Sequence, residues 1–172
     1  MISRDYCILM SRYNRWQNEK LYEVCGSLSD SERREDKRAF FGSIHSTLNH
    51  LIYADLAFLS RFAGDPAEVP PIGVDLYHTF EELREARETL DERICVWASS
   101  LSNVWLAQTL TYTSKVDGLA RTKKHWELVV HLFNHQTHHR GQLTTLLSQM
   151  GVDYGSTDLP FMPEPNPLQG CG

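Results

Sequence analysis

The chain has 172 residues, of which 41% are hydrophobic and 23% charged, and its net charge is −5. This length and composition predict one globular domain, residues 1–172, with a sizeable core. The acidic balance argues against a broad nucleic-acid-binding surface, which needs a basic face. No apolar run approaches the roughly 20 residues of a membrane span, and no signal peptide is evident. We therefore predict a cytoplasmic protein with neither a nucleic-acid nor a membrane partner.

The four cysteines are Cys7, Cys25, Cys95 and Cys171. None belongs to a C-x-x-C pair, and their spacings do not match a zinc ribbon. Reduced thiols are the norm inside the cell. We therefore expect free cysteines rather than a disulfide framework.

Apolar residues recur at helical spacing in four long segments. These segments predict helices at about 5–28, 40–62, 79–101 and 124–150. Gly64 and Gly151 follow the second and fourth segments as stop signals. Helices of this length would each extend roughly 33–40 Å, which suits a four-helix bundle. Long connections after the second and third helices leave room for crossovers.

A small hairpin is predicted before the last helix. Asp117-Gly118 lies between two short β-prone runs, residues 110–113 and 119–122, and Asp-Gly favours a tight hairpin turn. The tail, residues 151–172, is rich in proline and glycine and shows no periodicity. The predicted fold class is therefore all-α, a four-helix bundle with a β-hairpin.

Five of the eight histidines lie between His125 and His139. At about 100° per residue, His131, His135 and His139 differ by steps of about 40° and share the leucine-rich face of the fourth helix. His135 and His139 are four residues apart and can direct both rings at one point, as in zinc-binding H-E-x-x-H helices. The glutamate of that motif is missing, which argues against a metalloprotease.

A firm metal site needs a third ligand, and His50 is the best candidate. It lies midway along the second predicted helix, beside small side chains that leave space for its ring. His45 points about 140° away from it. A histidine near an apolar face is also often a hydrogen-bonded core residue, so this alternative stays open. His131 and His138 are further ligands, partners of ligands, or partly exposed residues.

Two other polar residues have open roles, and no catalytic residue is predicted. Asp55 interrupts the apolar stripe of the second helix. It is either a base or acceptor near the metal, or a buried carboxylate paired with an arginine or tyrosine, and the second interpretation is favoured. Gln142 lies on the histidine face and can orient a metal-bound group.

Several stretches resemble the DinB family of bacterial proteins. They are YNRWQNEKLYEV, FFGSIHSTLNHLIYADLAFLSRF, HLFNHQTHHRGQLTTLLSQMG and VDYGSTDLPFM. The most specific part is N-H-x-x-x-H-R-G-Q together with an upstream L-N-H. The resemblance implies a bundle with crossover connections, often a homodimer, that holds one divalent metal ion on three histidines. By motif these are His50, His135 and His139, whereas His138 falls at a position that the family does not use.

Three histidine ligands leave a coordination position open, as in catalytic zinc sites. Zinc or nickel suits imidazole ligands. Members of the family resemble thiol-dependent S-transferases and a maleylpyruvate isomerase. We therefore predict a metal-dependent enzyme that holds a low-molecular-weight thiol cosubstrate as its thiolate for attack on a small electrophile. The alternatives are a non-catalytic metal-binding stress-response protein and a metal-dependent hydrolase.

Overall fold

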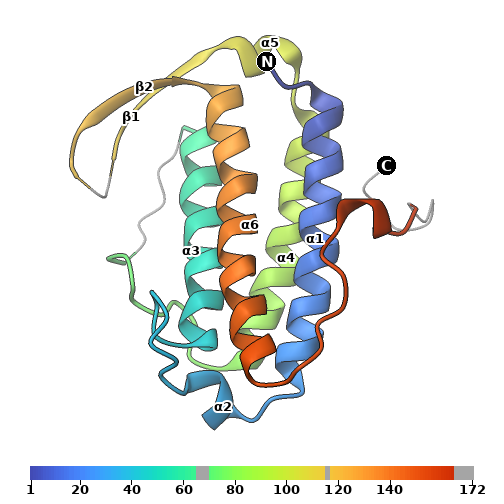
Figure 1. Ribbon diagram of the computed structural model, residues 1–172. Helices are drawn as coiled ribbons and strands as arrows, with labels where there is room; N and C mark the ends of the chain where they lie inside the picture. Colours follow the sequence, from blue (N-terminus) through green and yellow to red (C-terminus); the bar gives the residue numbers. More distant parts are fainter. Residues whose placement is uncertain (65–69, 115–116, 165–172) are drawn as a thin grey trace.

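The computed structural model describes residues 1–64, 70–114 and 117–164. Its four long helices lie side by side (Figure 1): α1 (Arg4–Gly26), α3 (Ile44–Phe62), α4 (Phe80–Ser100) and α6 (His125–Gln149). The shorter elements are α2 (Asp30–Arg34), α5 (Asn103–Ala107), β1 (Thr109–Thr113), β2 (Ala120–Lys124) and the 3-10 turn η1 (Leu159–Phe161). This architecture confirms the predicted all-α class with a hairpin before the last helix.

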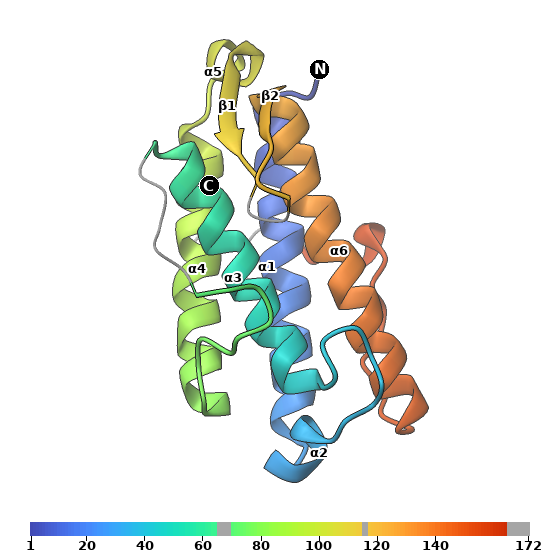
Figure 2. The ribbon, with the colours of Figure 1, turned by 90° about the vertical axis from the view of Figure 1, so that its left-hand side faces the viewer.

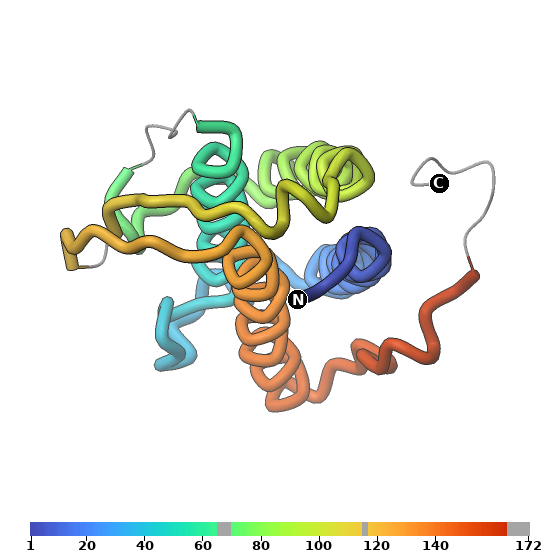
Figure 3. Tube along the Cα trace, turned by 90° about the horizontal axis from the view of Figure 1, so that it is seen from above, coloured from blue at the N-terminus to red at the C-terminus, as the bar shows by residue number. Residues whose placement is uncertain are grey.

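The four long helices form a square when the bundle is viewed from above (Figure 3). Around the square the order is α1, α4, α3, α6, and each helix contacts its two neighbours. In Figure 2, α3 ends near the upper end of the bundle and α4 begins near the lower end, so the chain crosses over between them. As a result α3 and α6, which carry the candidate ligands, lie next to each other.

The start of α3 differs from the prediction. The helix begins at Ile44 rather than near Phe40, because the side chain of Ser43 accepts a hydrogen bond from the N–H of Ser46 at 3.1 Å. The two phenylalanines before the cap lie in a turn in which Gly42 has a φ of 78°. The apolar pattern of the helix continues through this turn, so the pattern alone does not show where the helix begins. The ends of the other long helices differ from the predicted ranges by one or two residues.

The predicted hairpin is confirmed. Strands β1 and β2 pair antiparallel, with Thr111 opposite Thr122. Gly118 in the turn has a φ of 70°, a left-handed conformation that glycine adopts without strain. The hairpin leans over α3, where the ring of Tyr112 lies 4.5 Å from the guanidinium carbon of Arg61. It therefore adds a wall beside the two histidine-bearing helices.

A buried polar network lies in the centre of the bundle. The guanidinium of Arg87 lies 2.7 Å from the carboxylate of Asp55 and 3.0 Å from that of Asp91. Asn18 of α1 donates to Asp91 at 2.9 Å, and Arg140 of α6 donates to another α1 asparagine. The network links all four long helices. It confirms the interpretation of Asp55 as a buried carboxylate paired with an arginine.

Two of the cysteines, Cys7 and Cys25, are buried thiols outside any disulfide. Burial raises the pKa of Cys7 to about 11 and that of Cys25 to about 12. Thiols with such values are poor nucleophiles at neutral pH, because the thiolate is the reactive form. Cys171 lies outside the described residues. Among the helices in the described ranges, none is long and apolar enough to cross a membrane.

Candidate metal centre

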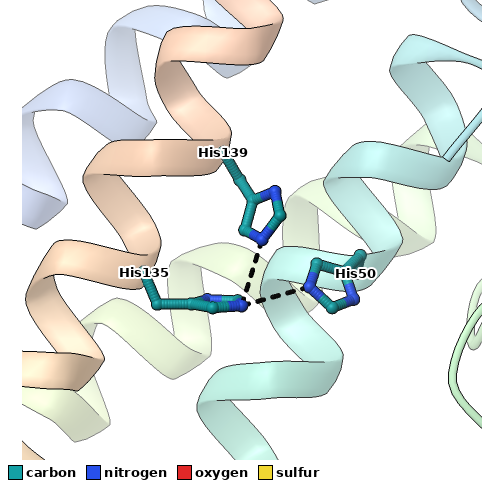
Figure 4. A group of neighbouring side chains, drawn as sticks. All are labelled: His50, His135 and His139. Carbon is teal, nitrogen blue, oxygen red and sulfur yellow. Dashed lines mark hydrogen bonds between the residues drawn. The ribbon is translucent and has the colours of Figure 1, made fainter. Parts of the chain in front are cut away.

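The three predicted ligands converge between α3 and α6. Figure 4 shows His50 from α3 facing His135 and His139 from α6. Nε2 of His135 lies 3.2 Å from Nε2 of His50 and 3.0 Å from Nε2 of His139. The candidate ligand atoms of the three residues all lie within 4.8 Å of one another. The fold thus brings together three histidines that span 90 residues of sequence.

Local geometry explains how α6 contributes two rings. Residues four apart on a helix lie on one face, one above the other. The ring centroids of His135 and His139 are 4.3 Å apart, and that of His50 is 4.5 Å from His139. Phe41, from the turn before α3, stacks on His50 with centroids 3.9 Å apart. Its role at the site was not predicted, because its place outside the helix was not recognised.

Gln142 determines which nitrogen of His139 carries the proton. Its Oε1 lies 2.7 Å from Nδ1 of His139. A carbonyl oxygen can only accept a hydrogen bond, so Nδ1 of His139 is the protonated nitrogen and Nε2 keeps its lone pair. The Gln142 amide nitrogen lies 3.3 Å from Nε2 of His138. Gln142 therefore orients the imidazole of His139, one of the three candidate ligands.

The contacts between the three rings are compatible with a cation bound among them. Nε2 of His135 is shared between the other two rings and can carry at most one hydrogen. At least one of the two contacts therefore lacks a well-directed N–H···N hydrogen bond. Nitrogens bound to one tetrahedral zinc ion at 2.0–2.1 Å would lie about 3.3 Å apart, close to the two separations measured from Nε2 of His135. A metal ion at the centre would satisfy all three lone pairs at once.

All three imidazoles are uncharged at neutral pH. Burial, followed by repulsion from the neighbouring His139, lowers the pKa of His50 to about 4 and that of His135 to about 3. Burial also lowers the pKa of His139. Neutral imidazole is the form that binds metals, so little proton release opposes binding.

The remaining nearby histidines do not join the group. His131 lies one turn before His135, and its ring contacts Phe58 with centroids 5.1 Å apart. His138 is exposed and reaches Gln142. His45 is buried and lies 3.1 Å from the carbonyl of Tyr77. Within the described chain, none of these three histidines therefore belongs to the group formed by His50, His135 and His139.

A cavity of about 360 Å³ opens beside the three histidines. His50 and His135 form part of its wall. The rest is largely apolar or aromatic and includes Tyr53, Phe58 and Tyr112. Small-molecule sites have volumes of roughly 300–1,000 Å³ and apolar walls with a few polar groups. The cavity therefore has the size and character of a site for a small molecule next to the metal position.

Replacing Gln142 by leucine is expected to weaken metal binding by about 10–100-fold, because the ring of His139 would lose the hydrogen bond that fixes its tautomer. Nδ1 of His50 and Nδ1 of His135 have no hydrogen-bond partner among the described residues. The hydrogen bond between His139 and Gln142 therefore has no counterpart at the other two rings. A competition titration with a chromophoric chelator measures the change. Gln149→Leu, at an exposed position of α6, is the control and should bind normally. Equal affinity in both variants would contradict the role of Gln142.

Comparison with known proteins agrees with this architecture. The profile of the DinB family matches residues 1–169, a range that contains all four long helices and the three histidines. The chain is also 26% identical over 163 residues to Protein DinB of Bacillus subtilis (strain 168). That similarity covers 90% of this chain and 91% of the relative. The chain therefore belongs to the DinB family.

Proposed function

We propose that this protein binds one divalent metal ion, zinc or nickel, on His50, His135 and His139 and works as a thiol-dependent S-transferase. The observation that carries the proposal is the convergence of three uncharged imidazoles beside a cavity of about 360 Å³. When bound, the metal would hold a small thiol as its thiolate, since coordination deprotonates a thiol. The thiolate would then attack a carbon of a small electrophile in the cavity and form a C–S bond, while chloride leaves a chloroarene or a C–O bond of an epoxide opens.

The cysteines Cys7 and Cys25 are unsuited to act as the attacking thiol, which supports a separate thiol cosubstrate. The raised pKa values of Cys7 and Cys25 make both side chains poor nucleophiles. Neither residue lines the cavity. Gln142 orients one ligand, and Phe41 covers the ring of another.

Two other functions use the same ligands. A non-catalytic metal-binding stress protein needs no cavity, so the cavity favours an enzyme. A metal-dependent hydrolase would use bound hydroxide, usually with a general base close by. The described residues that line the cavity include no carboxylate, but they include His131, which would be available to a hydrolase as a base. The thiol dependence of the reaction therefore separates the transferase from the hydrolase.

The proposal also covers the domain organisation, the cellular location and the oligomeric state of the protein. We propose that it is one domain, that it acts in the cytoplasm, and that it forms a homodimer, as the family resemblance implies. Light scattering coupled to size-exclusion chromatography measures the mass. A mass near 40 kDa is expected for the dimer, twice the 19.8 kDa of one chain. A single-chain mass at all concentrations would contradict the dimer.

The direct test is thiol-dependent consumption of an electrophile. Zinc- and nickel-loaded protein is incubated with a chloroarene or an epoxide, together with glutathione, bacillithiol or mycothiol. The electrophile should be consumed with at least one thiol, and the reaction should stop in metal-free protein. If none of the three thiols supports the reaction although metal is bound, the transferase proposal fails. Consumption without any thiol would indicate the hydrolase.

A further inference from the structure

The cavity extends along α3 from the histidine group to Arg61. His50, Ala54, Ala57 and Arg61 all line it, at the four- and three-residue intervals of one helix face. Arg61 comes eleven residues after His50, which corresponds to about 16 Å along the axis and a rotation of only about 20°. His50 and Arg61 therefore line one cavity from positions about three helical turns apart on the same face of α3.

Arg61 has an unusual environment for a partly buried cation. Its guanidinium carbon lies 5.0 Å from the ring of Phe58 and 4.5 Å from the ring of Tyr112. Among residues 1–64, 70–114 and 117–164, the Arg61 guanidinium has no ion-pair or hydrogen-bond partner. By contrast, Arg87 in the core pairs with two carboxylates. Burial lowers the pKa of Arg61, but an arginine keeps its charge at neutral pH.

The two aromatic rings hold the guanidinium in place without neutralising it. Cation–π contacts contribute about 0.5–2 kcal/mol and leave the five N–H donors available. A partly desolvated cation without an anion is unfavourable, and an incoming carboxylate would relieve this through two parallel hydrogen bonds. No acidic side chain among the described lining residues competes for that role.

We propose that Arg61 is the anchor for an anionic group at the far end of the thiol that binds the metal. This inference rests on the proposed function and names the class of its thiol cosubstrate. The sulfur would lie at the end of the cavity that His50 and His135 line. The middle of the molecule, apolar or aromatic, packs against Phe58 and Tyr112, and the terminal anion reaches the guanidinium.

Two matched probes test the anchor. 4-(Mercaptomethyl)benzoate carries a thiol and a carboxylate, and 4-(mercaptomethyl)benzamide replaces the carboxylate by a neutral amide of similar shape. Calorimetric titration of the cobalt-loaded protein measures both affinities. The benzoate should bind about tenfold more tightly than the benzamide, the effect of a hydrogen-bonded charge. The Arg61→Gln variant should lose this preference and bind the benzamide within about twofold of the wild type.

Arg93→Gln is the matched control, because Arg93 is exposed on α4 and does not line this cavity. It should keep the full preference for the benzoate. Equal affinities of the two probes for wild-type protein would overturn the inference, whether or not the Arg61 variant folds. A preference that persists in Arg61→Gln would overturn it as well.

The same titration examines the proposed function separately. A thiolate bound to cobalt gives a sulfur-to-metal charge-transfer absorption, which does not depend on Arg61. If this absorption is missing with both probes, the metal-bound thiolate is wrong. An Arg61-dependent preference for the benzoate would still support the anion anchor in that case.

Discussion

Replacing His50, His135 or His139 by alanine is expected to lower metal affinity by more than about 100-fold. Loss of an outer hydrogen-bond partner of a ligand already weakens binding by about 10–100-fold, and loss of the ligand itself is more severe. The three Nε2 atoms converge on one point, so the two remaining rings cannot make up for the missing one. Metal content after purification, followed by a chelator competition titration, measures the loss.

His131→Ala is the matched control for this series. It removes an imidazole from the same face of α6, one turn from His135, without removing a member of the histidine group. We expect metal binding close to that of the wild type. Full retention of metal in any of the three alanine variants would remove that histidine from the ligand set, and a large loss in His131→Ala would add a fourth ligand.

The second large effect is expected from Arg87→Met in the core, which should destabilise the protein by about 3–5 kcal/mol. The exposed fraction of Asp55 is 0% and that of Asp91 is 3%. Without the guanidinium both carboxylates would stay buried without their counter-ion, and a buried carboxylate without a partner is strongly unfavourable. Urea unfolding of metal-free protein, followed by circular dichroism, measures the change in the free energy of unfolding.

Arg93→Met, on the exposed side of the same helix, serves as the control and should change stability by less than about 0.5 kcal/mol. The triple variant D55L/R87M/D91L should recover much of the loss, because apolar residues can replace a buried ionic group at little cost. A loss below about 1 kcal/mol in Arg87→Met would show that the ion pairs do not stabilise the bundle in this way.

Local signals in the sequence were sufficient for the helices and for two of the three histidines of the site. Helical periodicity depends on hydrogen bonds between residues four apart, so it can be recognised in a single segment. The same spacing directs His135 and His139 to one point. Asp117-Gly118 marked the hairpin for an equally local reason, since a tight turn requires a residue that tolerates positive φ.

The sequence pattern of α3 by itself could not establish His50 as a metal ligand. Its position beside small side chains made it the best candidate for a third ligand but still permitted a core histidine, and the family motif favoured the ligand. The structure places α3 beside α6, through a crossover whose path no local pattern reveals. The same limit applies to Asp55, whose partner Arg87 lies on another helix.

The sequence alone therefore determined the number and approximate positions of the long helices, the hairpin and the paired histidines of α6. The tertiary structure decided which helices are neighbours, how Phe41 and Gln142 support the rings, and which residues enclose the cavity. Tyr112 reaches that cavity from the hairpin, and Arg61 from the end of α3. Contacts of this kind depend on packing between segments far apart in the chain, so they leave no periodic signal in the sequence.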